Sequence, residues 1–396
     1  MEGRKMSRNK NIKRLVVVPI LGTALALTQL SGSAFAAGAK FDLAGFAKAF
    51  NAAGYDQVAD GINRADNPPL TLADGSTFRL SKKISDKIKA GKAFNYVESI
   101  QSNGIALFSP QYMIGYKASC NIAKKFGPIN CKEVAPNPAG PTQQVAQIQA
   151  LLNTGQIDCL SIEPTDSNSL TDITNAAMKK GIPVFTVGVS TNGNEFTNWT
   201  QIPDKEGLFA AKTLLAWMKK TGTELTVFSA TGGDTTQYWA QNRMAGFEKG
   251  IKAAIPNAVF INSASSNQLN VSYDPATTYD AYKALLAGQP KLQFILSVDI
   301  GAEHATRAVH DAGLDGKVFT MGWNVSKGQL DGIEAGTQVA ALDQGWAQQS
   351  AFGAAACMAY LHTGRVAPNT QHLIPISKSN LDAARVAFNK LTGANN

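Results

Sequence analysis

The chain has 396 residues, with 37 Lys and Arg against 29 Asp and Glu, which gives a net charge of +8. Six of the bases and one of the acids lie in residues 1–36, so 31 bases and 28 acids remain in the other 360 residues. This small remaining excess of bases excludes the strongly basic signature of a nucleic-acid-binding protein. A chain of 360 residues is longer than one hydrophobic core usually organises, so we expect two domains.

The first 36 residues have the layout of a secretory signal peptide. Basic residues precede an apolar stretch, Leu15–Leu27, and the small-x-small triplet Ala34-Phe35-Ala36 follows. This pattern predicts export to the periplasm and cleavage after Ala36. The alternative of a retained membrane anchor is disfavoured, because the apolar stretch is shorter than the roughly 20 residues that span a bilayer.

The sequence predicts that residues 37–102 form an N-terminal extension that is partly helical. Helix-like patterns cover Leu43–Asn63 and Lys82–Ile100, and a Pro-, Gly- and Asp-rich stretch separates them. We assign no chemistry to this region.

From Gly104 onward, short β-rich runs alternate with amphipathic segments. The expected strands form two series: Ile105–Phe108, Asn130–Val134, Ile157–Ile162, Val184–Val189 and Phe196–Trp199, then Leu225–Ser229, Ala258–Ser263, Leu292–Val298, Val318–Trp323 and Val339–Asp343. Such alternation predicts an α/β fold with two similar, doubly wound parallel sheets. The long helix-like segment Trp346–Leu361 lets the chain return to the first half.

Four cysteines are too few for a disulfide scaffold, although an exported chain can oxidise a pair. Cys120 and Cys131 flank the end of a predicted helix and the start of the next strand, so they are the pair expected to be bonded. Cys159 and Cys357 lie in apolar runs and are expected to be buried thiols.

Ligands of open α/β sheets bind at the carboxyl ends of the strands, and two such halves make the cleft between them the natural site. The residues after the strands are aromatic rings, amides, hydroxyls and a few carboxylates, such as Asp166 and Asp299. Rings pack on the apolar faces of neutral polyhydroxylated ligands, and the polar groups bond to hydroxyls. The alternative is that two of the aromatic residues, Trp323 and Trp346, belong to the core.

Enzyme motifs fit less well. The glycines of TGGDTTQYW, Thr231–Trp239, do not match a dinucleotide-binding pattern, and VGVSTNG has the wrong spacing for a nucleophile elbow. The four histidines are not at metal-ligand spacing. Asp234 and Asp299 could form a carboxylate pair for glycoside hydrolysis, but a binding site uses carboxylates too. We predict no catalytic residue, no metal and no cofactor.

Runs such as IDCLSIEPTDSNSLTDITNAAMKKGIPVFTV and VFTMGWN resemble the type I periplasmic sugar-binding proteins, which feed ABC transporters; the resemblance covers about 103–390. It implies two lobes that close on one sugar molecule. The three hinge strands would lie near Thr200–Gln201, Gln344–Gly345 and Leu373–Ile374. One lobe would be 103–200 plus 345–373, and the other 201–344 plus 374–396.

The resemblance also implies site residues. The family's contacts after the first strand fall on Ser109–Tyr112, and an aromatic–carboxylate pair falls on Trp323 and Asn324. The hinge glutamine falls on Gln344. A helix contact that is often arginine falls on Gln241.

One family feature is missing. The Asp-Arg pair at the end of the IPV strand is replaced by Gly188 and Val189, which makes this site less charged and roomier than in simple aldose binders. We therefore expect a neutral ligand.

The sequence thus predicts a monomeric solute-binding protein that captures a sugar, polyol, deoxy sugar or nucleoside and delivers it to a membrane permease. A chemoreceptor ligand-binding protein and a secreted sugar-active enzyme remain as alternatives. The export signal and the missing helix-turn-helix count against a cytoplasmic repressor. The predicted ligand-binding residues are Ser109, Gln111, Tyr112, Asp166, Gly188, Asp234, Gln237, Trp239, Gln241, Asp299, Trp323, Asn324 and Gln344.

Overall fold

The structure is a computed structural model and describes residues 41–67, 71–105 and 108–392. The predicted signal peptide and its cleavage site lie outside these ranges. Within them, no helix combines the length and the apolar character that crossing a membrane requires.

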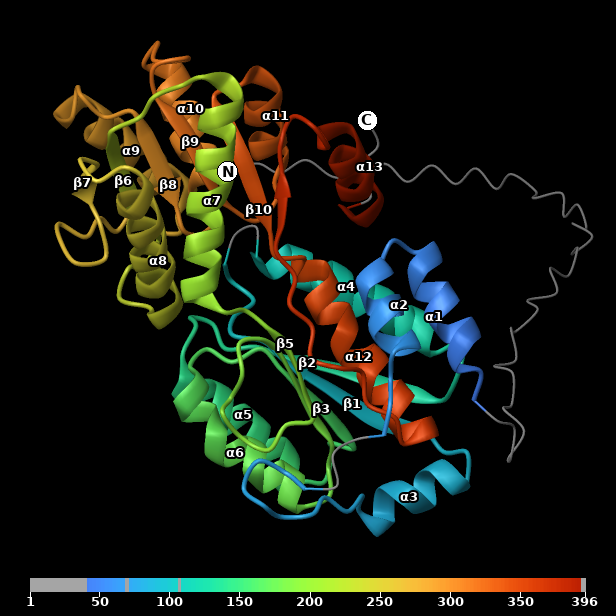
Figure 1. The fold of residues 1–396 in the computed structure, drawn as a ribbon. Coiled ribbons are helices and arrows are strands. Elements are labelled where there is room, and N and C mark those ends of the chain that lie inside the picture. The colour runs from blue at the N-terminus through green and yellow to red at the C-terminus, as the bar shows by residue number, and fades with distance from the viewer. Residues whose placement is uncertain (1–40, 68–70, 106–107, 393–396) are drawn as a thin grey trace, which may run out of the picture. The chain divides into compact units, whose positions relative to one another are not determined.

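The first lobe is built on a parallel sheet of five strands in the order β2-β1-β3-β4-β5. Its strands are β1 Phe94–Ser99, β2 Ile129–Val134, β3 Cys159–Ile162, β4 Val184–Gly188 and β5 Thr197–Thr200. Helices α4 (Phe108–Ala123) and α12 (Trp346–Thr363) cover one face, and α5 (Pro141–Asn153) and α6 (Ser167–Lys179) cover the other (Figure 1). This is a doubly wound half, as the alternation predicted.

The first strand is not where the sequence placed it. The helix expected over Lys82–Ile100 ends early, as α3 (Lys82–Lys89), and the run FNYVES that follows forms β1 in the interior of the sheet. Phe94, Tyr96 and Val97 on that strand are buried. The expected strand Ile105–Phe108 is wrong, because Phe108 begins α4. The first lobe therefore starts before residue 103.

The N-terminal helices belong to the same lobe. Helices α1 (Leu43–Ala52) and α2 (Asp56–Asn63) pack against each other, and they also contact α4 and α12. Phe46 and Phe50 have no exposed surface and join the core cluster of this lobe. Helix α12 is consequently enclosed between the sheet and the N-terminal helices, which explains why it carries no charged residue from Trp346 to Leu361.

The second lobe has a six-stranded sheet in the order β11-β10-β9-β8-β6-β7, parallel except at β11. Its strands are β6 Val227–Thr231, β7 Val259–Asn262, β8 Phe294–Ser297, β9 Phe319–Trp323, β10 Gln338–Asp343 and β11 Ile374–Ile376. Without β11, the order repeats that of the first lobe, which confirms two similar halves.

The helices of the second lobe also divide between the two faces of its sheet. Helices α7 (Pro203–Thr221) and α8 (Tyr238–Ala254) pack together, and they contact β10 and β6 respectively. Helices α9 (Pro275–Gly288), α10 (Ala302–Asp311) and α11 (Lys327–Ala335) form the other layer, with α13 (Leu381–Thr392) beside α11.

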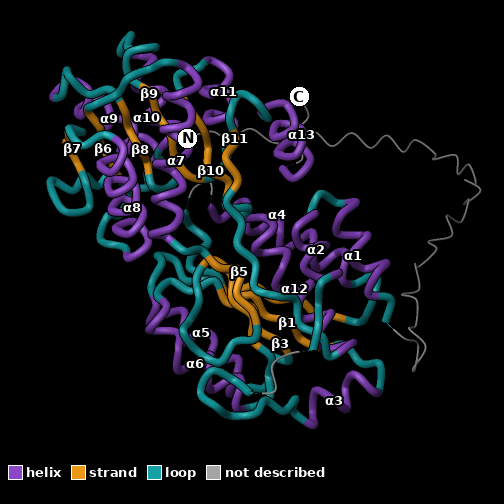
Figure 2. Tube along the Cα trace, in the orientation of Figure 1, coloured by secondary structure: helices purple, strands orange, loops and turns teal. Residues whose placement is uncertain are grey.

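Three segments connect the lobes, as the teal loops of Figure 2 show. They lead from β5 to α7, from β10 to α12 and from α12 to β11. The first and third lie side by side, because Trp199 and Thr370 form a parallel bridge. The two lobes are thus joined by three connecting segments, as in the expected three-strand hinge.

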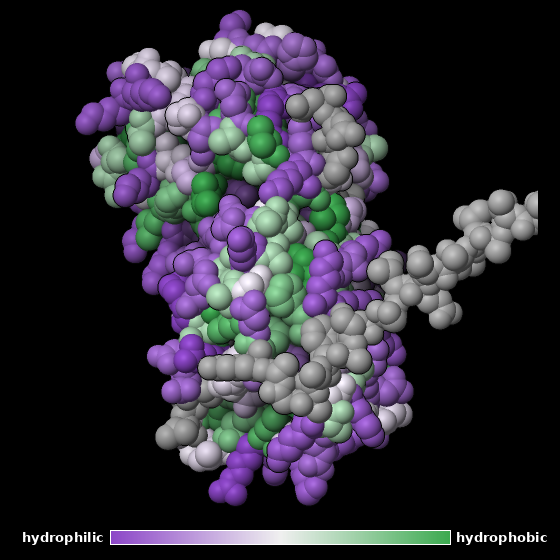
Figure 3. Space-filling view, turned by 90° about the vertical axis from the view of Figure 1, so that its right-hand side faces the viewer, coloured by the Kyte–Doolittle hydropathy of each residue, from purple (hydrophilic) through white to green (hydrophobic). Residues whose placement is uncertain are grey.

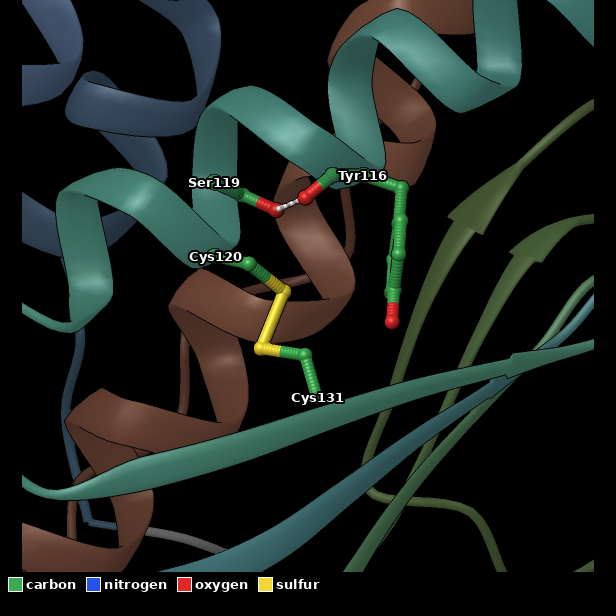
Figure 4. Close-up of a disulfide and its surroundings, with 4 residues drawn as sticks. All are labelled: Tyr116, Ser119, Cys120 and Cys131. Atoms are coloured by element: carbon green, nitrogen blue, oxygen red, sulfur yellow. Dashed lines mark hydrogen bonds between the residues drawn. A yellow bond between two sulfur atoms is a disulfide. The ribbon is translucent and has the colours of Figure 1, made fainter.

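Both pairs of cysteines are bonded. Cys120 on α4 and Cys131 on β2 form the expected disulfide (Figure 4). The prediction of two free thiols is wrong, because Cys159 on β3 is bonded to Cys357 on α12. These residues are 198 positions apart, and only the return of α12 onto the first sheet brings them together.

The surface carries few large exposed hydrophobic residues. The face in Figure 3 is mostly hydrophilic, with hydrophobic residues in small patches. Tyr238 is the most exposed large hydrophobic residue among those described, at 73%. It stands at the start of α8, beside the cleft described next.

Candidate functional site

A cavity of about 560 Å³ opens between the carboxyl ends of the two sheets, a size typical of small-molecule sites. The first lobe contributes the loops after β3 and β4, and the second contributes the loops after β6, β8 and β9. The connecting segments at Gln201–Pro203 and Gln344 also line it. The site therefore contains groups from both lobes and from the hinge.

The second lobe presents a buried arginine to the cavity, Arg243 on α8, of which only 2% is exposed. Its Nη2 lies 2.7 Å from Glu206 Oε2, and its Nη1 donates to the main-chain oxygen of Val298 at 2.9 Å. Nη2 also donates to Gln201 Oε1 at 2.9 Å and to Gln344 Oε1 at 2.6 Å. The guanidinium thus joins two of the connecting segments to the wall of the cleft.

Close packing of two helices makes the Arg243–Glu206 pair possible. A Cβ on Gly207 of α7 would lie 2.2 Å from the main-chain oxygen of Arg243, and a Cβ on Gly246 of α8 would lie 2.4 Å from that of Asp204. Only glycine allows the backbones to approach so closely. The crossing places both charged side chains in the interior, where they neutralise each other.

Two indole rings hold the guanidinium. The guanidinium carbon of Arg243, Cζ, lies 5.1 Å from the ring centre of Trp239 and 4.8 Å from that of Trp323, and both distances suit a cation–π attraction. Trp239 lines the cavity, whereas Trp323 is fully buried behind it. Gln241 is exposed and does not line the cavity. The arginine that does line the cavity, Arg243, lies two residues after the position to which the resemblance assigned the helix contact.

The loop TGGDTTQYW does form part of the cleft. Gln237 and Trp239 line it, but Asp234 does not. Asp234 instead closes its own loop, where its carboxylate accepts from the Thr236 main chain at 2.9 Å and from Gln237 Nε2 at 2.8 Å.

A second carboxyl ties this loop to the next one. Asp299 lines the cavity, and its oxygens accept from the main-chain nitrogens of Gly233 at 2.5 Å and Gly301 at 3.2 Å. Burial raises the pKa of Asp299, and the hydrogen bonds from Gly233 and Gly301 oppose that rise. Its role in the fold is to hold two binding loops in register.

An amide pair lies where the second lobe meets the hinge. Gln344 Nε2 donates to Asn324 Oδ1 at 2.7 Å, and both residues line the cavity. Asn324 follows β9 in the left-handed region at φ 71°, which asparagine tolerates better than most residues. Within the described part of the chain its buried Nδ2 meets no acceptor, which leaves a donor for a ligand.

The first lobe contributes mostly polar loop residues, including the predicted Asp166 and Gly188. Asp166 also caps α6, where its Oδ1 accepts from the Ser169 main chain at 2.7 Å. The cavity also receives Glu163, directly after β3, and the aromatic rings of Phe108 and Trp346. Trp346 therefore reaches the site, although it begins a core helix.

Three predicted residues of the first lobe do not line the cavity. Ser109 Oγ donates to the Ser102 main chain at 3.0 Å, and the Tyr112 hydroxyl donates to Gln349 Oε1 at 2.6 Å in the core. Gln111 Nε2 donates to the main-chain oxygen of Val325 at 3.0 Å, and so contacts the other lobe directly. The reason is that α4 begins at Phe108, so these side chains belong to its first turns rather than to a loop.

No cluster of three or more His, Cys, Asp or Glu side chains suited to a metal ion occurs in the described ranges. Besides the paired Arg243 and the carboxyl groups of Asp166 and Asp204, the cavity offers amides, hydroxyls, aromatic faces and two carboxyls with raised pKa values, Glu163 and Asp299. This chemistry suits hydrogen bonding to a polar ligand.

Part of the chain is similar in sequence to a known binding protein. A curated relative, a D-ribose/D-allose-binding protein of Pseudomonas aeruginosa, is 27% identical over 232 residues, which cover 54% of this chain. The match spans 65% of that relative's length, slightly less than two thirds.

Solved structures cover more of the chain. The myo-inositol binding protein of Caulobacter, bound to myo-inositol, has a TM-score of 0.62 at 18% identity and covers 74% of this chain and 97% of its own. A solute-binding protein of an ABC transporter from Agrobacterium vitis, with bound D-fucose, has a TM-score of 0.60 at 19% identity and covers 74% and 98%. These likenesses establish the fold.

A family model described as a periplasmic binding protein domain matches residues 107–365, which is more than half of the chain. The match spans both lobes and most of the cavity-lining residues. The chain belongs to the periplasmic binding protein family.

Proposed function

We propose that this protein captures a neutral sugar or sugar-like polyol between its two lobes and delivers it to the permease of an ABC transporter. It would do so as a monomer in the periplasm, after removal of the signal peptide, and without catalysis.

The observation that carries this proposal is the shared lining of one cavity by both lobes. Aromatic rings from the first lobe (Phe108, Trp346) and from the second (Trp239, Tyr273) line it. Rings from two sides suit the apolar faces of a pyranose or cyclitol ring, and the amides and hydroxyls between them suit its hydroxyl groups.

The hinge explains how binding would be coupled to movement. Arg243 contacts Gln201 and Gln344 on two connecting segments, and it also lines the cavity. A ligand that touches both lobes stabilises the closed arrangement through contacts that the open one lacks. The closed surface would then be what the permease recognises.

The relatives support the ligand class. The three compared proteins are described as binding D-ribose or D-allose, myo-inositol and D-fucose, all uncharged polyhydroxyl compounds. The Asp-Arg pair expected at the end of β4 is absent here, so the exact sugar need not be any of these.

A thermal-shift screen tests the proposal. The purified protein is heated with D-ribose, D-allose, D-fucose, myo-inositol, a nucleoside and, as a charged control, a sugar phosphate. A ligand present at a hundred times its Kd should stabilise the fold by about 2.7 kcal/mol, which shifts the melting temperature visibly. We expect one neutral sugar or polyol to do so. A shift with the nucleoside or the sugar phosphate alone would contradict the proposed ligand class.

A further inference from the structure

A buried carboxyl stands at the first-lobe wall of the cavity. Glu163 directly follows β3, lines the cavity and is 6% exposed. The site described above assigns no role to it, and the predicted ligand-binding residues do not include it, although it directly follows the expected strand Ile157–Ile162. An acid in such a position is costly to ionise unless a cation accompanies it.

The side chain of Glu163 is held in place by Gln101. The main-chain nitrogen of Gln101 donates to Oε2 at 2.8 Å, and its side-chain Nε2 donates to Oε1 at 3.0 Å. On the other side, Gln144 Nε2 donates to the main-chain oxygen of Glu163 at 2.8 Å. The carboxyl is therefore fixed before any ligand arrives.

A glycine leaves this carboxyl accessible from the cavity. Gly188 ends β4 at φ 76°, a region where side chains are strained. A Cβ placed there would lie 3.2 Å from Glu163 Oε1 and 3.3 Å from its Cγ. Both residues line the cavity, so the missing side chain opens the space beside Oε1.

In the part of the chain that the structure describes, no ion pair joins Glu163 to a basic group. Its charged and titratable neighbours are Glu98 on β1 and Tyr112 on α4. The other charged residues that line the cavity are Asp166, Asp204, Asp299 and Arg243. Arg243 is already paired with its own buried glutamate on α7. The surroundings thus disfavour a negative charge on Glu163.

Burial raises the pKa of Glu163 to about 8, against an ordinary value of 4.5, and the hydrogen bond from the Gln101 main chain only partly opposes this. The group is then mostly protonated at neutral pH. A protonated carboxyl both donates and accepts a hydrogen bond, which a carboxylate cannot do.

We propose, on the basis of the function proposed above, that Glu163 binds the ligand as an un-ionised carboxylic acid through the opening beside Gly188. It exchanges hydrogen bonds with a hydroxyl group, and with Gln101 it takes the place of the charged Asp-Arg pair that the resemblance implied. The cleft accordingly selects uncharged polyols over both anionic and cationic sugars.

The test is a calorimetric titration of the intact protein and its variants with D-ribose and myo-inositol at pH 6 and pH 9. If only the protonated form binds, Kd should rise about tenfold over this range, because roughly a tenth of the molecules remain competent at pH 9. Glu163→Gln, which keeps the shape and a donor, should bind within about threefold of the wild type at pH 6 and lose the pH dependence. This loss assigns the effect to Glu163 rather than to Asp299.

Glu133→Gln, on β2 and outside the cavity, is the matched control and should keep the pH dependence. A ligand-free measurement accompanies it. Burial also raises the pKa values of Glu98 and Asp299, so the infrared spectrum of Glu163→Gln is subtracted from that of the wild type to remove the bands of other protonated carboxyls. The protonated-carboxyl band that remains in the difference spectrum should be present at pH 6 and lost at pH 9.

The outcomes separate the two proposals. Binding that is lost in Glu163→Gln at pH 6, or that is indifferent to both pH and this substitution, overturns the inference while leaving sugar binding intact. Tighter binding of D-glucosamine than of the neutral sugars, increasing with pH, also overturns it, because an ionised Glu163 would then be the partner. If no sugar or polyol binds the wild type, the proposed function fails and the inference fails with it, whatever the infrared band shows.

Discussion

Removing the Arg243 side chain should destabilise the protein strongly, because it leaves the buried carboxylate of Glu206 without its partner. The Glu206 side chain is fully buried, its Oε2 is 2.7 Å from the guanidinium, and its Oε1 has no partner in the described structure. In Arg243→Met this carboxylate is uncompensated, and breaking a buried ion pair from one side typically costs about 3–5 kcal/mol. We expect a loss of that order in the free energy of unfolding.

The assay is urea unfolding followed by circular dichroism for a complete cycle of variants. Adding Glu206→Met to Arg243→Met should recover most of the loss, since the double variant buries no charge. Lys252→Met, which breaks a partly exposed ion pair with Glu248 on the same helix, is the control and should change stability by less than about 0.5 kcal/mol. The reasoning is refuted if Arg243→Met is as stable as the control, or if the double variant is no more stable than Arg243→Met.

Three further predictions concern the disulfides, the cavity glycine and pH. Under reversible urea unfolding, Cys357→Ala should cost about 2.6 kcal/mol more than Cys131→Ala, because its bridge joins residues 198 positions apart instead of 11. Equal costs would contradict the loop-entropy account. Gly188→Ala should weaken ligand binding at least tenfold in calorimetry, since its Cβ would lie 3.2 Å from the carboxyl proposed to bind the ligand; unchanged affinity would count against that wall of the site. The raised pKa of Glu163 stabilises the fold fully below its unfolded value of 4.5, and this contribution is lost as the pH rises to about 8. The melting temperature of Glu163→Gln relative to wild type should therefore increase across that window, and a constant difference would refute the shift.

The fold was largely readable from the sequence, because strand–helix alternation is a local pattern and the chain repeats it twice. The prediction of the first strand was wrong. FNYVES is half polar, with Asn95, Glu98 and Ser99, and it follows a lysine-rich helix, so its burial depends on the sheet around it rather than on its own composition. The N-terminal helices were found, but their place in the core of the first lobe depends on the return of α12, which no local pattern reveals.

Of the residues predicted at strand ends and at the hinge, several line the cavity, whereas Asp234 and Trp323 do not. Gln237, Asn324 and Gln344 line the cavity because strand ends and hinges must face it. Arg243 was missed because the buried face of α8 depends on its close crossing with α7. A signal existed, since Arg243 lies one helical turn after Trp239.

The bridge between β3 and α12 was missed for a similar reason, because its two cysteines are joined by tertiary structure alone.

The central claim is that one ligand is held by both lobes at once. The most direct test is a calorimetric titration of the neutral sugar or polyol that gives the largest thermal shift, performed on Trp239→Ala from the second lobe and Ser190→Ala from the first, both of which line the cavity. The account predicts that each substitution weakens binding, Trp239→Ala by at least tenfold and Ser190→Ala by a smaller but clear factor. The Ser190 hydroxyl donates to Glu195 Oε1 at 2.7 Å and accepts from the Asn192 main chain at 2.9 Å, so its loss loosens the loop that forms the first-lobe wall. Binding that only one of the two substitutions weakens would contradict capture between the lobes.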